Sequence, residues 1–559
     1  MNKPFKTEIP LRGPDEIMKL DRMGSMFPSR MSFMRTLIRN LSRKAAIINR
    51  TLWEMDTEGF GRAVYSVTIG KDIYSLVAFS NKLDPSNRTD RVIAEAWDSS
   101  YVLYDGVPDT SEIDRLEKQV PLQEAGRYTS KDLILSRANK SVRLFSHVVE
   151  RLKNGIQPDL EMIRDIGYLM RTTAVYGNGK FGILDRNKIL DRDIISGPFM
   201  AEMLTVLLIR GFTHDLVEHV GCGELDRKYK KYLGIGNSTG LGMAPFLVEH
   251  PELISNWMMA KETGLARVRA IPYLNELQIK NFITLSKRVT LHLEQWNVPD
   301  MEYQARIKTL RLEWMQICEK LSKLLNNRKP IDSLLAFSKG FSLDCQELVV
   351  SFSLEESGEI VDGLTCCMVS DYSLPLNPVM SLKELKDIIN TKFQWATSVD
   401  FENKYETTQF WYVSEEKLEP RLGLRHEEPG AELESPMDIA RQIKSLYRDI
   451  KNQYKNTAEF LRDHPEHRSA VRRVQVMARY PYSEIQENLI SLNCKPIDML
   501  RCKLAFFGAA KFDPKSDRWV RIALGQGAPL LTDLNEKDES WLPVLTCLLY
   551  TSPSPRDRG

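Results

Sequence analysis

The chain of 559 residues has no long apolar run and no segment with the composition of a secretory signal. Its densest apolar stretch, 203–209, is far shorter than the roughly 20 residues that a membrane-spanning helix needs. The polar N-terminal leader mixes acidic and basic side chains and contains no apolar centre. We therefore expect a cytoplasmic protein with no membrane segment.

The chain also lacks an excess of charge of either sign. Its 77 lysines and arginines nearly balance 75 aspartates and glutamates, so no global field would hold a polyanion, and nucleic-acid binding is not expected. The 8 cysteines include no C-x-x-C pair, which is typical of free thiols in a reducing compartment. Neither disulfides nor a metal site are predicted, and no motif identifies a cofactor.

The end of the chain, 547–559, has the composition of neither a helix nor a strand. Its run from Cys547 to Asp557 resembles a translated sequencing adapter, a read-through found in genes assembled from metagenomic shotgun reads. We expect this segment to belong to no fold and the natural C-terminus to be missing. The alternative is a genuine disordered tail rich in serine, proline and arginine.

The N-terminal region, 1–127, combines a basic amphipathic helix with β-rich runs. Apolar and arginine side chains alternate at helical spacing over 29–48. Valine, isoleucine and tyrosine are then enriched in three runs, 62–69, 73–80 and 91–104, with a glycine turn between the first two. These runs predict a small antiparallel β meander.

The central region, 128–330, is predicted to be a helical domain. Thr129 and Asp132 resemble a capping box that opens a long helix running to Lys153. Two later segments carry apolar seams at alternating spacings of three and four residues, which predicts a long antiparallel helix hairpin. The seams consist of Ile279, Phe282, Ser286, Val289, Leu293 and Trp296, and of Tyr303, Ile307, Leu310, Trp314, Ile317, Leu321 and Leu324.

The last region, 331–546, is predicted to be a separate α+β domain. Runs at 347–352, 359–369, 409–413 and 518–524 have strand composition, and Ser381 with Glu384 predicts a capped helix. Glutamate and proline are dense over 414–436, which predicts a mobile acidic loop. The complete chain is therefore expected to have an α+β fold that is predominantly helical.

The most informative motif is the glycine-dense segment 234–245. A loop of this kind can direct backbone N–H groups at a phosphate or carboxylate. It lacks the P-loop spacing, and no strand–helix–strand pattern surrounds it, so neither ATP nor a dinucleotide is specified. The residues expected to hold an anion here are Gly234, Gly236, Asn237, Thr239, Gly240 and Gly242.

The same segment contains Ser238 in a G-x-S-x-G sequence, the pattern that presents the nucleophile of α/β-hydrolases. The charged residues before it, 226–233, have helical rather than buried-strand composition, which argues against that interpretation. A serine hydrolase is retained as a minor alternative.

A second glycine-dense element covers 176–182, where Asn178 and the following glycine favour a type I′ turn. Lys180 lies at this turn, Tyr176 precedes it, and Arg171 lies on the segment before it. Two cations near an open backbone suit an anionic substrate, so these residues are predicted to bind substrate. A tight turn alone would need the same glycines.

One helix carries the residues best suited to proton transfer. His214 and Glu218 are one turn apart, and Asp215 and His219 form an equivalent pair. A carboxylate beside an imidazole can act in acid–base catalysis, although surface ion pairs have the same spacing.

The leading hypothesis is a metabolic enzyme acting on a small anionic substrate, with its reaction class unspecified. The rival is a helical scaffold or regulatory binding protein, which would form a homo-oligomer through the helix at 300–328 or capture a partner.

Overall fold

The computed structural model describes most of the chain, and most of the described residues are helical. The described residues are 5–25, 27, 33–83, 97–120, 129–141, 143–172, 192, 194–197, 199–239, 251–297, 301–357, 360, 364, 376–402, 436–451, 453–483 and 520–534. No helix among them is long and apolar enough to cross a lipid bilayer.

The N-terminal half is built around one curled sheet of eight strands in sequence order. The strands are β1 (Ile47–Met55), β2 (Gly61–Ile69), β3 (Asp72–Ser80), β4 (Ser99–Asp105), β5 (Asp132–Lys140), β6 (Tyr168–Thr172), β7 (Gly234–Thr239) and β8 (Val520–Leu524). The pair β6/β7 is parallel, and the other described pairs are antiparallel. The predicted fold class is therefore wrong, because a mixed sheet replaces the small meander.

Local sequence signals explain the strands that were predicted correctly. β2 and β3 pair from Gly61 opposite Ser80 to Ile69 opposite Asp72, so the two residues between them form the predicted turn. Gly70 in that turn has a φ of +61°, which glycine adopts without steric cost.

The predicted capped helix at Thr129 is wrong. Asp132 accepts a hydrogen bond from the Thr129 N–H at 2.8 Å, but it opens strand β5, and the helix α5 (Leu144–Lys153) begins later. Pairing of β5 with β4 on one side and β6 on the other supplies the hydrogen bonds that the helix would have made.

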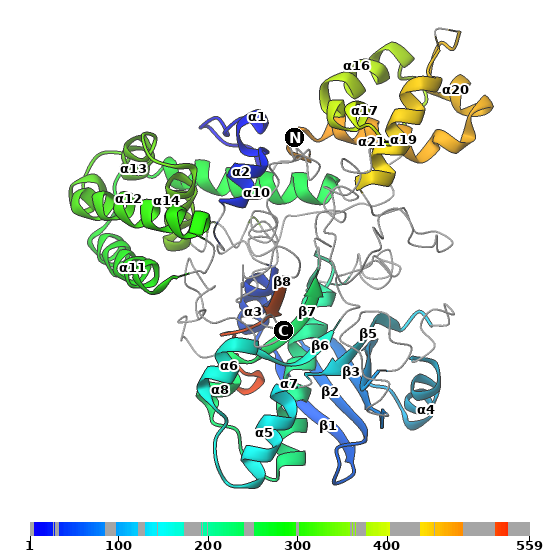
Figure 1. The fold of residues 1–559 in the computed structure, drawn as a ribbon, viewed down its shortest axis with the longest axis vertical. Coiled ribbons are helices and arrows are strands. Elements are labelled where there is room, and N and C mark those ends of the chain that lie inside the picture. Colours follow the sequence, from blue (N-terminus) through cyan, green and yellow to red (C-terminus); the bar gives the residue numbers. More distant parts are fainter. Residues whose placement is uncertain are drawn as a thin grey trace.

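The two faces of the sheet carry different helices (Figure 1). One face packs on α7 (Met200–Gly221), a helix that is apolar nearly all round and almost fully buried. The Phe212 ring of α7 lies 6.1, 6.4 and 5.7 Å from the rings of Trp53, Tyr65 and Tyr101 on β1, β2 and β4. The opposite face is covered at β2–β5 by α4 (Thr110–Gln119), through a smaller core that includes Leu116.

A first group of helices packs together above the sheet in Figure 1. It contains α10 (Pro251–Arg269), α11 (Glu276–Gln295), α12 (Met301–Leu325), α13 (Pro330–Ser338) and α14 (Leu343–Glu356). The seam of α12 is buried, but against several helices of this group, so the predicted long hairpin is replaced by a compact bundle. The predicted strand at 347–352 is also wrong, because it lies inside α14, which Ser342 caps.

A second group of helices has its own apolar core and contacts the first group at α10. It contains α16 (Leu382–Lys392), α17 (Gln394–Ser398), α19 (Pro436–Asp449), α20 (Thr457–Asp463), η5 (Pro465–His467) and α21 (Arg468–Arg479). The Ser381 hydroxyl accepts the Glu384 N–H at 3.1 Å, which confirms the predicted cap of α16.

The predicted C-terminal α+β domain is not found. None of the described residues between 376 and 483 lies in a strand. The strand predicted at 518–524 appears as β8, but it pairs with β7 of the N-terminal sheet. The predicted strand at 409–413 lies outside the described residues, as do almost all of 359–369 and the predicted acidic loop at 414–436 except Pro436, which begins α19.

The N-terminal elements α1 (Pro14–Ile17) and α2 (Leu20–Gly24) are held to the first helix group by buried charges. Arg12 donates to Glu262 and to Glu347, at 2.6 and 2.8 Å. Arg22 and Lys261 reach the same Glu347 carboxylate at 2.9 and 3.1 Å. These contacts join α10 and α14 to a segment more than 200 residues away in sequence.

Candidate functional site

One glycine-dense segment follows β6 in the chain, and the other begins in β7, the strand that pairs with β6 in parallel. α7 and α8 (Arg227–Tyr232) connect β6 to β7, and Arg171 on β6 lies opposite Gly236 on β7 in a parallel pair. A strand–helix–strand unit is therefore present where the sequence showed none. The chain leaves β6 after Thr172 and β7 after Thr239 at the same edge of the sheet. Ligands of open α/β sheets bind outside the carboxyl ends of parallel strands.

Several predicted binding residues follow these strand ends. Tyr176, Asn178 and Lys180 come after β6, and Gly240 and Gly242 come after β7. All five lie outside the described residues. Their substrate-binding roles stay predictions.

Gly234 and Gly236 lie within β7, not in a loop, and their lack of a side chain has a packing explanation. A Cβ atom on Gly236 would lie 2.5 Å from the ring of Tyr168, and one on Gly234 would lie 2.5 Å from the carbonyl oxygen of Leu524. Both contacts are shorter than real Cβ contacts allow. Glycine at these two positions lets β6 and β8 approach β7 closely.

Ser238 and its neighbours lie in the same strand. The backbone of β7 pairs with β8 through Asn237 opposite Ile522, Ser238 opposite Arg521 and Thr239 opposite Val520. A hydrolase nucleophile is presented on a sharp turn after a strand. Ser238 lies within paired strand backbone, and its catalytic role stays a prediction.

The four acid–base candidates on α7 each contact a different element. Asp215 accepts hydrogen bonds from Tyr65 Oη and, at 3.0 Å, from Arg50 Nη1. Glu218 accepts the Leu225 N–H at 2.6 Å and lies 2.8 Å from Lys230 Nζ. These carboxylates hold α7 to the sheet and to α8, so the structure gives each a positioning role.

The two histidines of α7 differ in environment. His219 Nε2 lies 2.7 Å from the Asp56 carbonyl oxygen in the β1–β2 turn. His214 is buried, and burial, with a further contribution from the charges of Arg210 and Lys230, lowers its pKa well below the ordinary value. Its imidazole is therefore neutral at physiological pH.

A group of hydrogen-bond donors lies on the sheet face opposite α7. Directly paired residues share a face, so Ser100 lies beside Arg137, and Asn139 lies beside Arg171. Trp97, just before β4, packs under Arg137, whose guanidinium carbon lies 4.2 Å from the ring centroid. Arg137 is close to the end of β6, because its neighbour on β5 pairs with Thr172, the last residue of that strand.

Two of these donors are buried without an acceptor. The Ser100 hydroxyl and the Trp97 indole N–H have no hydrogen-bond partner in the part of the chain that the structure describes, although both residues are more than 90% buried. An unsatisfied buried polar group costs about 1–3 kcal/mol. Buried O–H and N–H donors beside a guanidinium favour the binding of an anion. We call Trp97, Ser100, Arg137 and Arg171 the donor cluster.

One acidic side chain lies near the donor cluster. Asp98 is buried, and its carboxylate accepts the Lys140 N–H at 2.8 Å, while its own N–H donates to the Asn139 side chain at 3.1 Å. Asp98 therefore ties β4 to β5.

The donor cluster and the α7 candidates lie on opposite faces of the sheet. The sequence pointed to Arg171 but missed Arg137, because it assigned β5 to a helix. It missed Trp97 and Ser100 because only cross-strand contacts bring them to Arg137. The available signal was polar residues alternating with small ones over Ser136–Lys140, which suits a half-buried strand.

The sequence analysis did not identify His464, Glu466 and His467, in the second helix group, as a possible metal site. These side chains offer two imidazoles and a carboxylate within 4.8 Å of one another. The signal was the spacing His-x-Glu-His.

Comparison of the chain with protein-family models, curated proteins and solved structures found no match.

Proposed function

We propose that the protein is a metabolic enzyme that binds a small phosphate- or carboxylate-bearing substrate at the carboxyl ends of β6 and β7. The observation that carries the proposal is the pair of buried donors, Ser100 and Trp97, beside Arg137. An anion would supply the acceptor that both donors lack, and a planar guanidinium suits phosphate and carboxylate oxygens.

The geometry of the sheet supports the same location. Parallel pairing makes the chain leave β6 and β7 at the same edge of the sheet, and Arg137 of the donor cluster lies near the end of β6. The proposal therefore combines the predicted roles of Arg171, Lys180 and the glycines with donors that the sequence did not reveal.

The proposal is tested by thermal unfolding of the full chain with phosphorylated and carboxylate metabolites. A ligand at 100 times its Kd stabilises the native state by about 2.7 kcal/mol. We expect one chemical class to raise Tm, and we expect Ser100→Ala and Arg137→Lys to abolish the increase. The bound class then serves as candidate substrate in a turnover assay.

Ser80→Ala is the matched control. Ser80 is also buried on the sheet with an unpartnered hydroxyl among the described residues, but its cross-strand neighbour is Ser99, on the α7 face. Ser80→Ala should keep the ligand response. The proposal fails if no anion raises Tm, or if all three variants respond as the original chain does.

A scaffold is the second candidate, because α12 exposes large apolar side chains. Leu312 and Met315 are 63% and 55% exposed, and Leu291 on α11 is 55% exposed. We propose that this surface, the α11–α12 face, pairs two copies of the chain if the protein acts as a helical scaffold. Such a role predicts an oligomer without turnover.

A further inference from the structure

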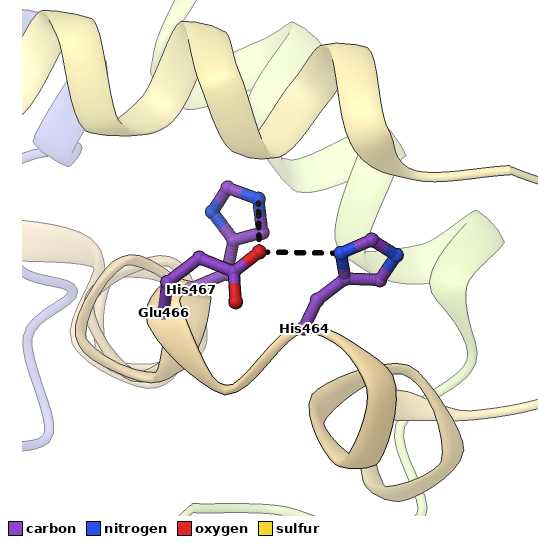
Figure 2. Close-up of side chains that lie close together, drawn as sticks. All are labelled: His464, Glu466 and His467. Atoms are coloured by element: carbon purple, nitrogen blue, oxygen red, sulfur yellow. Dashed lines mark hydrogen bonds and ion pairs between the residues drawn. The ribbon is translucent and has the colours of Figure 1, made fainter.

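His464, Glu466 and His467 converge at the junction of α20 and α21 (Figure 2). The Glu466 Oε1 atom lies 3.2 Å from His464 Nδ1 and 3.9 Å from His467 Nε2. All three side chains come from one short stretch of chain that includes the single turn η5. The two imidazoles therefore face one carboxylate oxygen across this turn.

Phe460 of α20 orients both imidazoles. Its ring stacks on His464 at 4.9 Å between centroids and 28° between planes, and on His467 at 5.7 Å and 12°. Phe460 is itself fully buried in the core of the second helix group. The two rings are therefore supported by the packed interior, which reduces the conformational freedom that a ligand set must lose on binding.

We propose that His464, Glu466 and His467 bind a divalent transition-metal ion, and that zinc is the ion that suits this ligand set best. Two imidazoles with one glutamate form an established zinc set, whereas magnesium and calcium prefer oxygen ligands alone. Bond lengths of about 2.1 Å place the ligand atoms of a tetrahedral ion about 3.4 Å apart. Two of the three separations bracket that value.

Rotation of the most exposed side chain can adjust the separations between the ligand atoms to those that a tetrahedral ion needs. Glu466 is 61% exposed, so packing does not oppose rotation of its carboxylate, whereas His464 is 31% exposed and is held by its stacking on Phe460. His467 is 7% exposed and provides the fixed ligand. Three protein ligands leave the fourth position of a tetrahedral ion for a further side chain or a water molecule.

The Asp449 carboxylate would compete with the ion for the His467 imidazole. Its Oδ2 atom lies 3.0 Å from His467 Nε2, and it is the last residue of α19. An ion on Nε2 displaces this hydrogen bond and leaves the Asp449 carboxylate beside the metal as a further ligand. Binding would then link α19 to the α20–α21 junction, and zinc should stabilise the second helix group.

The test measures zinc binding by the full chain after removal of metals with a chelator. Calorimetric titration with zinc chloride should show one site, and Co²⁺ should give the visible absorption of a four-coordinate ion. His464→Gln changes a half-buried side chain and Glu466→Gln an exposed one, and each should weaken zinc binding at least tenfold. Each should also remove the Co²⁺ absorption.

Glu319→Gln on α12 and His147→Gln on α5 are the matched controls, and both should bind zinc as the original chain does. The proposal is overturned if the chain takes up no zinc, or if His464→Gln and Glu466→Gln bind it as tightly as the controls. A rise in Tm with zinc that both site variants retain would also overturn it, because the ion would then be bound elsewhere.

Discussion

His292 shows at the residue scale how a buried titratable group makes stability depend on pH. It lies on α11, stacks on Trp296 at 5.4 Å, and neither ring nitrogen has a hydrogen-bond partner among the described residues. Burial, with a smaller contribution from the charge of Arg311, lowers its pKa to about 3. The unfolded chain, with an ordinary histidine pKa near 6.5, binds this proton more readily.

The free energy of unfolding should therefore be unaffected by His292 above about pH 6.5. It should fall as the pH decreases towards 3, because the unfolded chain binds the proton at a higher pH than the folded chain does. At pH 5, the proton that His292 binds in the unfolded chain lowers the free energy of unfolding by about 2 kcal/mol. We expect His292→Phe to reduce this acid sensitivity while keeping the stacked ring. Urea unfolding of both proteins at pH 7 and pH 5 measures the difference, and an equal loss in the two proteins would contradict the prediction.

At the element scale, the buried charges around Glu347 fasten the N-terminal segment to α10 and α14. Burial opposes ionisation of Glu347, but Arg12 and Lys261 overcome it and hold the pKa of this carboxyl well below its usual range. Glu347→Gln would leave Arg12, Arg22 and Lys261 without their shared carboxylate.

Removing one partner of a buried ion pair costs about 3–5 kcal/mol. We expect Glu347→Gln to lower the free energy of unfolding by about this amount, measured from the urea midpoint. Glu319→Gln, which makes the same chemical change on an exposed face of α12, should have little effect. A Glu347→Gln protein as stable as that control would show that the cluster does not fasten the segment.

Elements with strong local signals were predictable, and elements that depend on distant pairing were not. The turn at Gly70 and the cap at Ser381 are encoded within a few residues. β5 was assigned to a helix, since only its pairing with β4 and β6 makes it a strand. The candidate site was predictable to the same extent. Arg171 could be identified because it is close in sequence to a glycine motif, whereas Ser100 and Arg137 are brought together only by cross-strand pairing.

At the scale of the whole molecule, the α11–α12 face decides whether the chain works alone or in pairs. A groove of about 410 Å³ runs between the two helices and is lined in part by Thr290, Leu291 and Cys318. Leu312 and Met315 add exposed apolar area on α12. Contiguous exposed apolar surface on a folded protein often marks an interaction site.

Light scattering after gel filtration should therefore detect a dimer whose fraction rises with protein concentration, if this face pairs two copies. Leu312→Lys and Met315→Lys should shift the equilibrium to monomer, because each places a charge in the interface without disturbing the buried seam of α12. Val107→Lys changes another exposed apolar residue, 59% exposed near the end of β4, and should leave the dimer intact. A monomer at every concentration would remove the scaffold candidate and leave the anion-binding enzyme as the function to pursue.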